Sequence, residues 1–214
     1  MKSLGSVLGQ LRHLTVDRRL QILTAVCGML SVVVFSCSFV VFGFLHPDFN
    51  VFEDFISKLG GIGQPNALFW NVVGFGAVGL LLAVFGWLFG LCRNDRVLGA
   101  CLMVAGLGFA LAAIPTDFSA PQSPISAAHF ISICIALAGY CLGMARLTGS
   151  KSTAYDRIMA NWVVALAILP IVCVSGGVSA EPVAHRIILI VVFTWVVLNS
   201  LRLLKPENAA EVAL

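Results

Sequence analysis

Charged residues are scarce in this chain. Asp, Glu, Lys and Arg make up 11% of its 214 residues, whereas hydrophobic residues make up 59%, and the mean hydropathy is +0.99. A soluble domain typically carries about 25% charged residues. Because a short chain has a large surface relative to its volume, it cannot bury so many apolar residues in a soluble core. The composition therefore excludes a soluble globular domain and predicts an integral membrane protein.

Several functional motifs are absent as well. The seven cysteines form no C-x-x-C pair and lie in or at the edge of apolar runs, so a redox centre or a disulfide framework has no support. Neither a glycine-rich phosphate loop nor a G-x-S-x-G motif occurs, so neither of these motif-based assignments applies. The chain also lacks a basic stripe with interleaved aromatic residues, and we expect no nucleic-acid partner.

Long apolar runs are what the sequence does contain. Six runs are near the ~20 residues that cross a hydrocarbon core, although the third and the sixth are short. In lipid such runs must be helices, because every backbone N–H and C=O needs a partner within its own segment. The predicted fold is therefore all-α, an integral membrane bundle of six transmembrane helices in a single domain over residues 20–204. The runs are Leu20–Leu45, Ala67–Cys92, Val97–Ile114, Ser126–Ala145, Ile158–Gly176 and Ile187–Leu201.

Lysine and arginine set the expected orientation. If the N-terminus is inside, all 13 of these residues except Lys58 and Arg186 fall in inner segments. The inner loops are short enough for the positive-inside rule to apply. We therefore expect a basic cytoplasmic N-terminal segment over residues 1–19 and a cytoplasmic C-terminal tail over residues 205–214. The short loops and the lack of soluble appendages favour a bacterial inner membrane, with the outer side in the periplasm.

Polar and ionisable residues gather on the outer side of this arrangement. Although the outer loops of any membrane protein are polar, Asp117, His129 and Arg186 stand at helix edges, where ionisable side chains usually face the bundle interior and find partners. We expect an ion pair between Asp117 and Arg186. We also expect His129 to lie inside the bundle, beside Ser57 and near Asn71. The other outer residues of this kind are His46, Asp48, Glu53, Asp54, Glu181 and His185.

The first outer loop, residues 46–66, is the longest of the outer loops. Apolar residues recur within it at helical spacing, and polar residues fill the remaining positions. This pattern predicts a short amphipathic helix at the outer interface, which would clip two helices together or cover the polar residues as a lid. The apolar positions are Val51, Phe52, Phe55, Ile56 and Leu59, and the polar ones are Glu53, Asp54, Ser57 and Lys58.

The order of several short motifs resembles a known family. HPDF, ISKLG and FWNVVGF occur in the first half, IPTDF and AAHF follow, and VAHRI comes late. With the motifs in this order, the chain resembles the small membrane proteins grouped as domain of unknown function 998. The resemblance covers about residue 20 to residue 204. Ile114 stands where that family usually has Phe. The resemblance implies a membrane fold with six spans and no particular activity, and it places the family's pattern residues on Pro47, Ser57, Asn71, Pro115, Asp117, His129 and Arg186.

A non-catalytic role is the first of two function classes that these residues leave open. The protein would then bind lipid, transport a solute or serve as a structural component, with an outward-facing polar cluster that includes Glu53, Asn71 and Arg186. No cofactor is expected in this case. Membrane lipid is the expected partner, and the formation of a homo-oligomer is left open.

The second class is an intramembrane hydrolase or lipid-modifying enzyme. Ser57, His129 and Asp117 would supply the nucleophile, the base and the orienting residue of a catalytic triad. Alternatively, His46, His129 and His185 would hold a zinc ion that activates water. Geometry distinguishes the two classes, because catalysis requires the Ser57 hydroxyl within hydrogen-bond reach of a His129 nitrogen beside a cavity for substrate.

Overall fold

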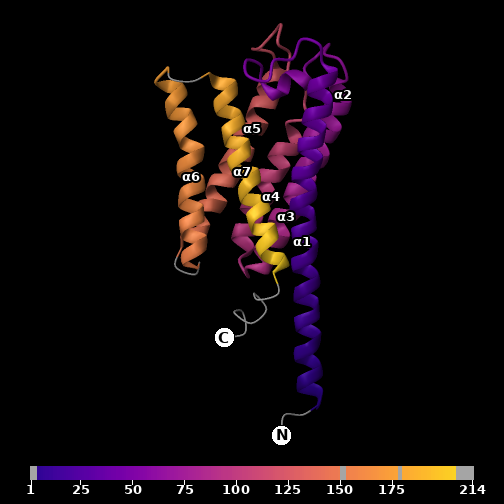
Figure 1. Cartoon of the computed structure of the whole chain (residues 1–214), viewed down its shortest axis with the longest axis vertical. Helices are drawn as coiled ribbons and strands as arrows, with labels where there is room; N and C mark the ends of the chain where they lie inside the picture. The colour runs from indigo at the N-terminus through magenta and orange to yellow at the C-terminus, as the bar shows by residue number, and fades with distance from the viewer. Residues whose placement is uncertain (1–3, 150–152, 178–179, 206–214) are drawn as a thin grey trace.

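A computed structural model describes residues 4–149, 153–177 and 180–205, with side chains from residue 18 onward except that of residue 171. The described residues form helices and no strand, as Figure 1 shows. The part of the C-terminal tail over residues 206–214 lies outside the described residues. The helices are α1 Leu4–Leu45, the 3₁₀ helix η1 Ile56–Gly60, α2 Ala67–Trp70, the π-helix η2 Asn71–Ala77, α3 Val78–Cys92, α4 Arg96–Leu111, α5 Pro124–Leu147, α6 Ala154–Ser175 and α7 Glu181–Leu204.

Five of the described segments are long and apolar enough to cross a membrane. In one of them, α2, η2 and α3 follow one another directly as a single span, and α4 is a shorter apolar helix. The all-helical, multi-span character expected from the composition is therefore confirmed, and the chain is an integral membrane protein. The five segments are Arg18–Leu45, Ala67–Cys92, Pro124–Leu147, Ala154–Ser175 and Glu181–Leu204.

Local sequence explains where several helices begin. The Asp95 side chain accepts a hydrogen bond from the Leu98 N–H and caps α4. Ser123 caps α5 in the same way, and Pro124 occupies the first position of that helix, where a missing N–H costs nothing. These caps satisfy backbone donors that a helix start leaves unpaired.

The helices pack as a bundle in which α4 lies between α3 and α5, α1 packs against α3 and α7, and α6 packs against α7 at one edge (Figure 1). Glycine residues allow the central contacts. A Cβ atom on Gly106 of α4 would overlap the Ala83 backbone of α3, and one on Gly139 of α5 would overlap the Ala105 backbone of α4. Small residues at these points bring the helix backbones together, as in other membrane bundles.

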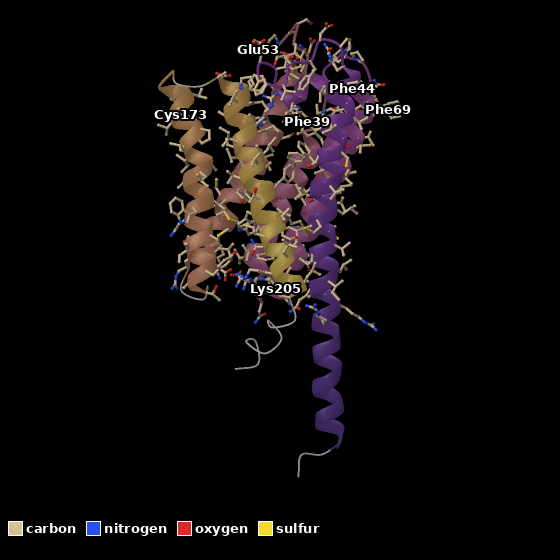
Figure 2. The ribbon with its side chains drawn as sticks, in the orientation of Figure 1. Phe39, Phe44, Glu53, Phe69, Cys173 and Lys205 are labelled. Atoms are coloured by element: carbon tan, nitrogen blue, oxygen red, sulfur yellow. The ribbon has the colours of Figure 1, made fainter. Side chains whose placement is uncertain are left out.

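The two ends of the bundle differ. We call the end that carries residues 46–66 and 112–123 the loop end, and the end at which α7 finishes the terminal end. Figure 2 shows Glu53 at the loop end and Lys205 at the terminal end.

An ion-pair network fastens the terminal end. Asp156 of α6 is 5% exposed and accepts hydrogen bonds from Arg93, which follows α3, and from Arg202 of α7, the latter at 3.2 Å. The same carboxylate accepts a hydrogen bond of 2.6 Å from the Thr153 hydroxyl within a capping box. One buried carboxylate therefore joins α6 to α7 and to the end of α3.

The first loop differs from the sequence prediction. The amphipathic helix expected from Val51 to Leu59 is present only as the five-residue η1, and the residues before it form turns. Asn50 and Asp54 explain this, because the Asn50 side chain accepts from the Phe52 N–H at 2.9 Å and the Asp54 carboxylate accepts from the Asn50 N–H at 2.8 Å. Such bonds from side chains to the backbone compete with helix formation.

Candidate functional site

An apolar cavity of about 120 Å³ lies between α3, α4, α5 and α7. On α7 its wall runs from His185, near the loop end, to Val196, and on α5 it runs from Ile133 to Tyr140. Eleven residues of helix at about 1.5 Å each place His185 and Val196 about 16 Å apart along α7. The cavity is therefore elongated along the helices and extends from the loop end into the middle of the bundle.

Two buried polar atoms in this wall lack a hydrogen-bond partner among the described residues: Tyr140 Oη and His185 Nδ1. Tyr140 is 6% exposed, and its ring packs edge to face on Trp195 at 5.8 Å between centroids. Nearly all buried polar groups in proteins are paired, so each exception needs an explanation. Both atoms belong to the cavity wall, where a polar group of a ligand can form a hydrogen bond with them.

His129 lies at the loop end of the same region. It is buried, its ring packs edge to face on Phe75 at 6.0 Å, and its Nδ1 lies 2.8 Å from the Ile114 carbonyl oxygen. Because a carbonyl only accepts, Nδ1 carries the proton, and in the neutral ring Nε2 is left as an acceptor. The predicted burial of His129 is confirmed, and its catalytic role stays a prediction.

The predicted ion pair between Asp117 and Arg186 is wrong. The ion pairs formed within the described part of the chain do not include it. Asp117 Oδ1 instead accepts hydrogen bonds from the Ser119 hydroxyl at 2.6 Å, the Ser119 N–H at 2.9 Å and the Ala120 N–H at 3.1 Å. These bonds, that of the Ser119 hydroxyl first, hold the pKa of Asp117 below its ordinary value. Turn formation within its own loop thus uses the carboxylate that Arg186 was expected to bind.

Arg186 is held by backbone carbonyls. Its two terminal nitrogens donate to the carbonyl oxygens of Pro182, at 2.9 Å, and of Asp54 in the first loop. Its Nε is buried and has no partner among the described residues. Arg186 therefore ties α7 to the first loop, and no carboxylate of the described residues lies at ion-pair distance from its guanidinium.

The remaining polar residues of the sequence prediction do not form one cluster. Ser57 lies half-buried in η1, and no hydrogen bond joins it to His129 in the described part of the chain. The buried Asn71 donates from Nδ2 to the Gly60 carbonyl at 2.9 Å, and a side chain on Gly60 would overlap the Asn71 carboxamide. Glu53 is exposed at the surface of the loop. Asn71 thus fixes the end of η1, and the Ser57–His129 pair that catalysis needs is not assembled.

The three histidines considered for zinc do not share their contacts. His46 donates from Nε2 to Gln64 Oε1 at 2.8 Å and packs against Phe49. His185 lines the cavity, and His129 is bonded to the Ile114 carbonyl oxygen. Over residues 4–149, 153–177 and 180–205, no group of three or more His, Cys, Asp or Glu side chains is placed to hold a metal ion. The set of His46, His129 and His185 is therefore not brought together here, and zinc content stays a prediction.

Sequence reasoning missed Tyr140. It is one of only two tyrosines in the chain, and it lies within an apolar run, where a phenolic hydroxyl needs a partner. That isolation was a usable signal. The cavity itself had none, because it depends on how four helices rotate against one another.

The first loop closes the loop end through Asp54. Its carboxylate forms a 2.8 Å ion pair with Lys58, and the Lys58 ammonium also donates to the Asp48 carbonyl at 2.8 Å. The Phe55 ring of this loop lies edge to face on the His185 ring at 6.2 Å. The loop therefore covers the end of the cavity at which His185 lies.

Acid should loosen this loop. Partial burial alone would raise the pKa of Asp54, but hydrogen bonds from Lys58 and Asn50 outweigh it and hold the pKa below its ordinary value. Because the folded-state pKa is lowered, the carboxylate stabilises the closed loop above its unfolded-state pKa, and this contribution is lost as the pH falls through the folded-state pKa. Hydrogen exchange over residues 50–60, corrected for the intrinsic rate, should accelerate in that range.

Two variants serve as the comparison for this pH effect. Asp54→Asn should show fast exchange in the loop at every pH, whereas Asp48→Asn should behave as the wild type, because the Asp48 contact uses its backbone carbonyl. Wild-type protection that does not change with acid would show that Asp54 does not hold the loop.

The fold and the site define a class: an all-helical integral membrane protein with an apolar cavity between its helices and a loop over one end of it. The chain belongs to the family described as "Protein of unknown function (DUF998)", which it matches over residues 26–204. No curated protein and no solved structure matches the sequence.

Proposed function

We propose that this protein binds the apolar chain of a membrane lipid in the cavity between α3, α4, α5 and α7, with the polar end of the lipid at the loop end. The observation that carries the proposal is the cavity of about 120 Å³, whose apolar wall includes two polar atoms, of Tyr140 and His185, that have no hydrogen-bond partner among the described residues. An apolar cavity of about 150 Å³ binds benzene in another protein. The space therefore suits a segment of one alkyl chain.

A hydrolase is less well supported by the same residues. The Nδ1 of His129 is bonded to the Ile114 carbonyl, and Asp117 is bonded within its own turn. Asp117 is therefore not available as the residue that orients His129. Lipid binding requires only the cavity and its polar atoms, so we prefer it to the triad of Ser57, His129 and Asp117.

Lipid retention tests the proposal. The protein released from membranes in a mild detergent should carry one lipid-sized molecule per chain in native mass spectrometry, and this molecule should be recovered by solvent extraction. A protein that carries no such molecule, and that takes up none from added membrane lipid, would contradict the proposed function.

The proposal includes six membrane crossings. α4 has 16 residues, which corresponds to about 24 Å of helix. It is short for a hydrocarbon core of about 30 Å, but it lies between α3 and α5 and joins the terminal end to the loop end. We place the first loop at the outer interface of a bacterial inner membrane and both termini in the cytoplasm, because lysine and arginine gather at the terminal end.

Reporter fusions test this orientation. A fusion at residue 150 and one after residue 214 should both be active as cytoplasmic reporters and inactive as periplasmic ones, whereas a fusion within residues 46–66 should show the reverse. A periplasmic signal from either of the first two positions would contradict the six-span arrangement.

A further inference from the structure

We propose that the bound molecule is an anionic amphiphile with a single chain, whose carboxylate or phosphate is held by Arg186 and His185 beneath the first loop. This inference rests on the proposed function, because it identifies the polar group of the lipid that fills the cavity. It is carried by the position of Arg186, by the absence of an ion-pair partner for Arg186 among the described residues, and by the size of the cavity.

The helical spacing of α7 places Arg186 on the face of the helix that lines the cavity. Residues three or four apart share one face of a helix, and Arg186 shares its face of α7 with Leu189, Phe193 and Val196, which all line the cavity. His185 begins the neighbouring stripe and lines the cavity itself. The two side chains are therefore the first polar groups that a chain lying in the cavity meets at the loop end.

The guanidinium of Arg186 forms no ion pair among the described residues. Its two bonded nitrogens use backbone carbonyls, which carry no net charge, and its buried Nε has no partner among the described residues. The charge of the Asp54 carboxylate acts on it, but this carboxylate is already bonded to Lys58 and to the Asn50 N–H. A cation near the hydrocarbon edge is costly without a partner, and a guanidinium binds carboxylate and phosphate groups with well-matched geometry.

His185 supplies a second polar contact. Its Nδ1 is buried and unpartnered among the described residues, and Phe55 of the loop lies against the edge of its ring. Phe55 and the bond from Arg186 to the Asp54 carbonyl place the first loop over this pair of side chains. An anionic group between Arg186 and His185 would accept hydrogen bonds from Arg186 Nε and His185 Nδ1, and the loop would shield it from solvent.

The cavity volume limits the ligand to one chain. A space of about 120 Å³ is slightly smaller than the cavity of about 150 Å³ that takes one benzene molecule, so two acyl chains side by side do not fit. Fatty-acid anions and lysophospholipids with a terminal phosphate share the required chemistry: one apolar chain and one anionic end.

Equilibrium binding of radiolabelled oleate to the full-length protein in nanodiscs tests the inference, with empty nanodiscs as the blank. Oleate and lysophosphatidate should compete with the label, whereas methyl oleate should compete at least tenfold more weakly, because the ester lacks the charge that Arg186 binds. Inorganic phosphate without a chain should not compete. Equal competition by phosphate would show a site for a free anion and would overturn the inference.

Variants separate the head group from the chain. Arg186→Gln should weaken oleate binding at least tenfold and leave methyl oleate unchanged, and Arg186→Lys should recover part of the loss. Lys205→Gln, which removes one positive charge at the terminal end, is the matched control and should bind as the wild type. If Arg186→Gln does not fold, the comparison of oleate with its ester on the wild-type protein decides alone.

The outcomes distinguish the two proposals. If acid and ester bind equally well, the cavity binds a chain and the inference about its head group is overturned. If neither binds above the blank, the proposed function fails as well.

Discussion

A tryptophan at position 192 should remove most lipid binding and leave the protein folded. Val192 lines the cavity from α7 and is only partly buried, so a larger side chain can extend into the empty space instead of displacing neighbours. Because the cavity measures about 120 Å³, an indole ring would occupy much of it. We expect at least a tenfold loss of retained lipid in native mass spectrometry, with the unfolding temperature unchanged or raised as the void is filled.

Ile190→Trp is the matched control for this result. Ile190 lies two residues away on the same helix and is 64% exposed, so the same substitution there faces away from the cavity. It should retain lipid as the wild type does. Equal retention by Val192→Trp and the wild type would contradict the assignment of the cavity as the binding site.

Loss of charge at Asp156 should have the largest effect on stability. Asp156→Asn keeps a side chain that can accept the hydrogen bond from the Thr153 N–H in the capping box of α6, but it removes the negative charge that Arg93 and Arg202 share in a buried position. Removing one partner of a buried ion pair typically costs about 3–5 kcal/mol, because the remaining charge is left uncompensated. Thermal unfolding in detergent should show a loss toward the lower end of that range.

Asp95→Asn provides the comparison for Asp156. Asp95 also caps a helix and also pairs with an arginine, but its partner Arg146 is 45% exposed. Partial burial would raise the pKa of Asp95, but hydrogen bonds from the Leu98 N–H and Arg146 lower it on balance. An exposed pair contributes about 1 kcal/mol or less, so this variant should be much less destabilised. Similar losses at both sites would show that burial of Asp156 does not matter.

The membrane-spanning helices could be predicted because lipid leaves the backbone little choice. The second apolar run, Ala67–Cys92, coincides with the span formed by α2, η2 and α3. The last run was expected to begin at Ile187, yet α7 begins at Glu181. Hydropathy marks the part of a helix that lies in lipid, whereas the start of α7 is favoured by Pro182 in its first turn.

The contacts of the polar residues were harder to predict. Burial of His129 followed from its depth in an apolar run, but its partner, the Ile114 carbonyl, is a backbone group that no residue pattern indicates. The charges of Asp117 and Arg186 suggested a long-range pair, and short-range turn bonds to Ser119 prevailed. Local bonds of this kind form at little cost in chain entropy.

The cavity could not be inferred from the sequence at all. Its lining residues are ordinary apolar residues of four helices, and a void appears only where their side chains fail to meet. Tyr140 and His185 become candidate ligand contacts only because they line this void with polar atoms that have no hydrogen-bond partner in the described part of the chain.

The most direct test of chain binding uses Trp195 as a reporter. Trp195 is 2% exposed and lines the cavity, whereas Trp162 is 63% exposed, so lipid around the bundle reaches Trp162 and not Trp195. Fluorescence should be measured in liposomes that contain 9,10-dibromostearate, with the double variant Trp87→Phe/Trp162→Phe, in which Trp70 and Trp195 remain. The triple variant that also carries Trp195→Phe gives the emission of Trp70, which is subtracted to leave that of Trp195. Saturable quenching of Trp195 is the predicted result. Trp162 is measured in the same way in Trp87→Phe/Trp195→Phe. A Trp195 emission that stays unquenched while the Trp162 emission is quenched would contradict binding of a lipid chain in the cavity.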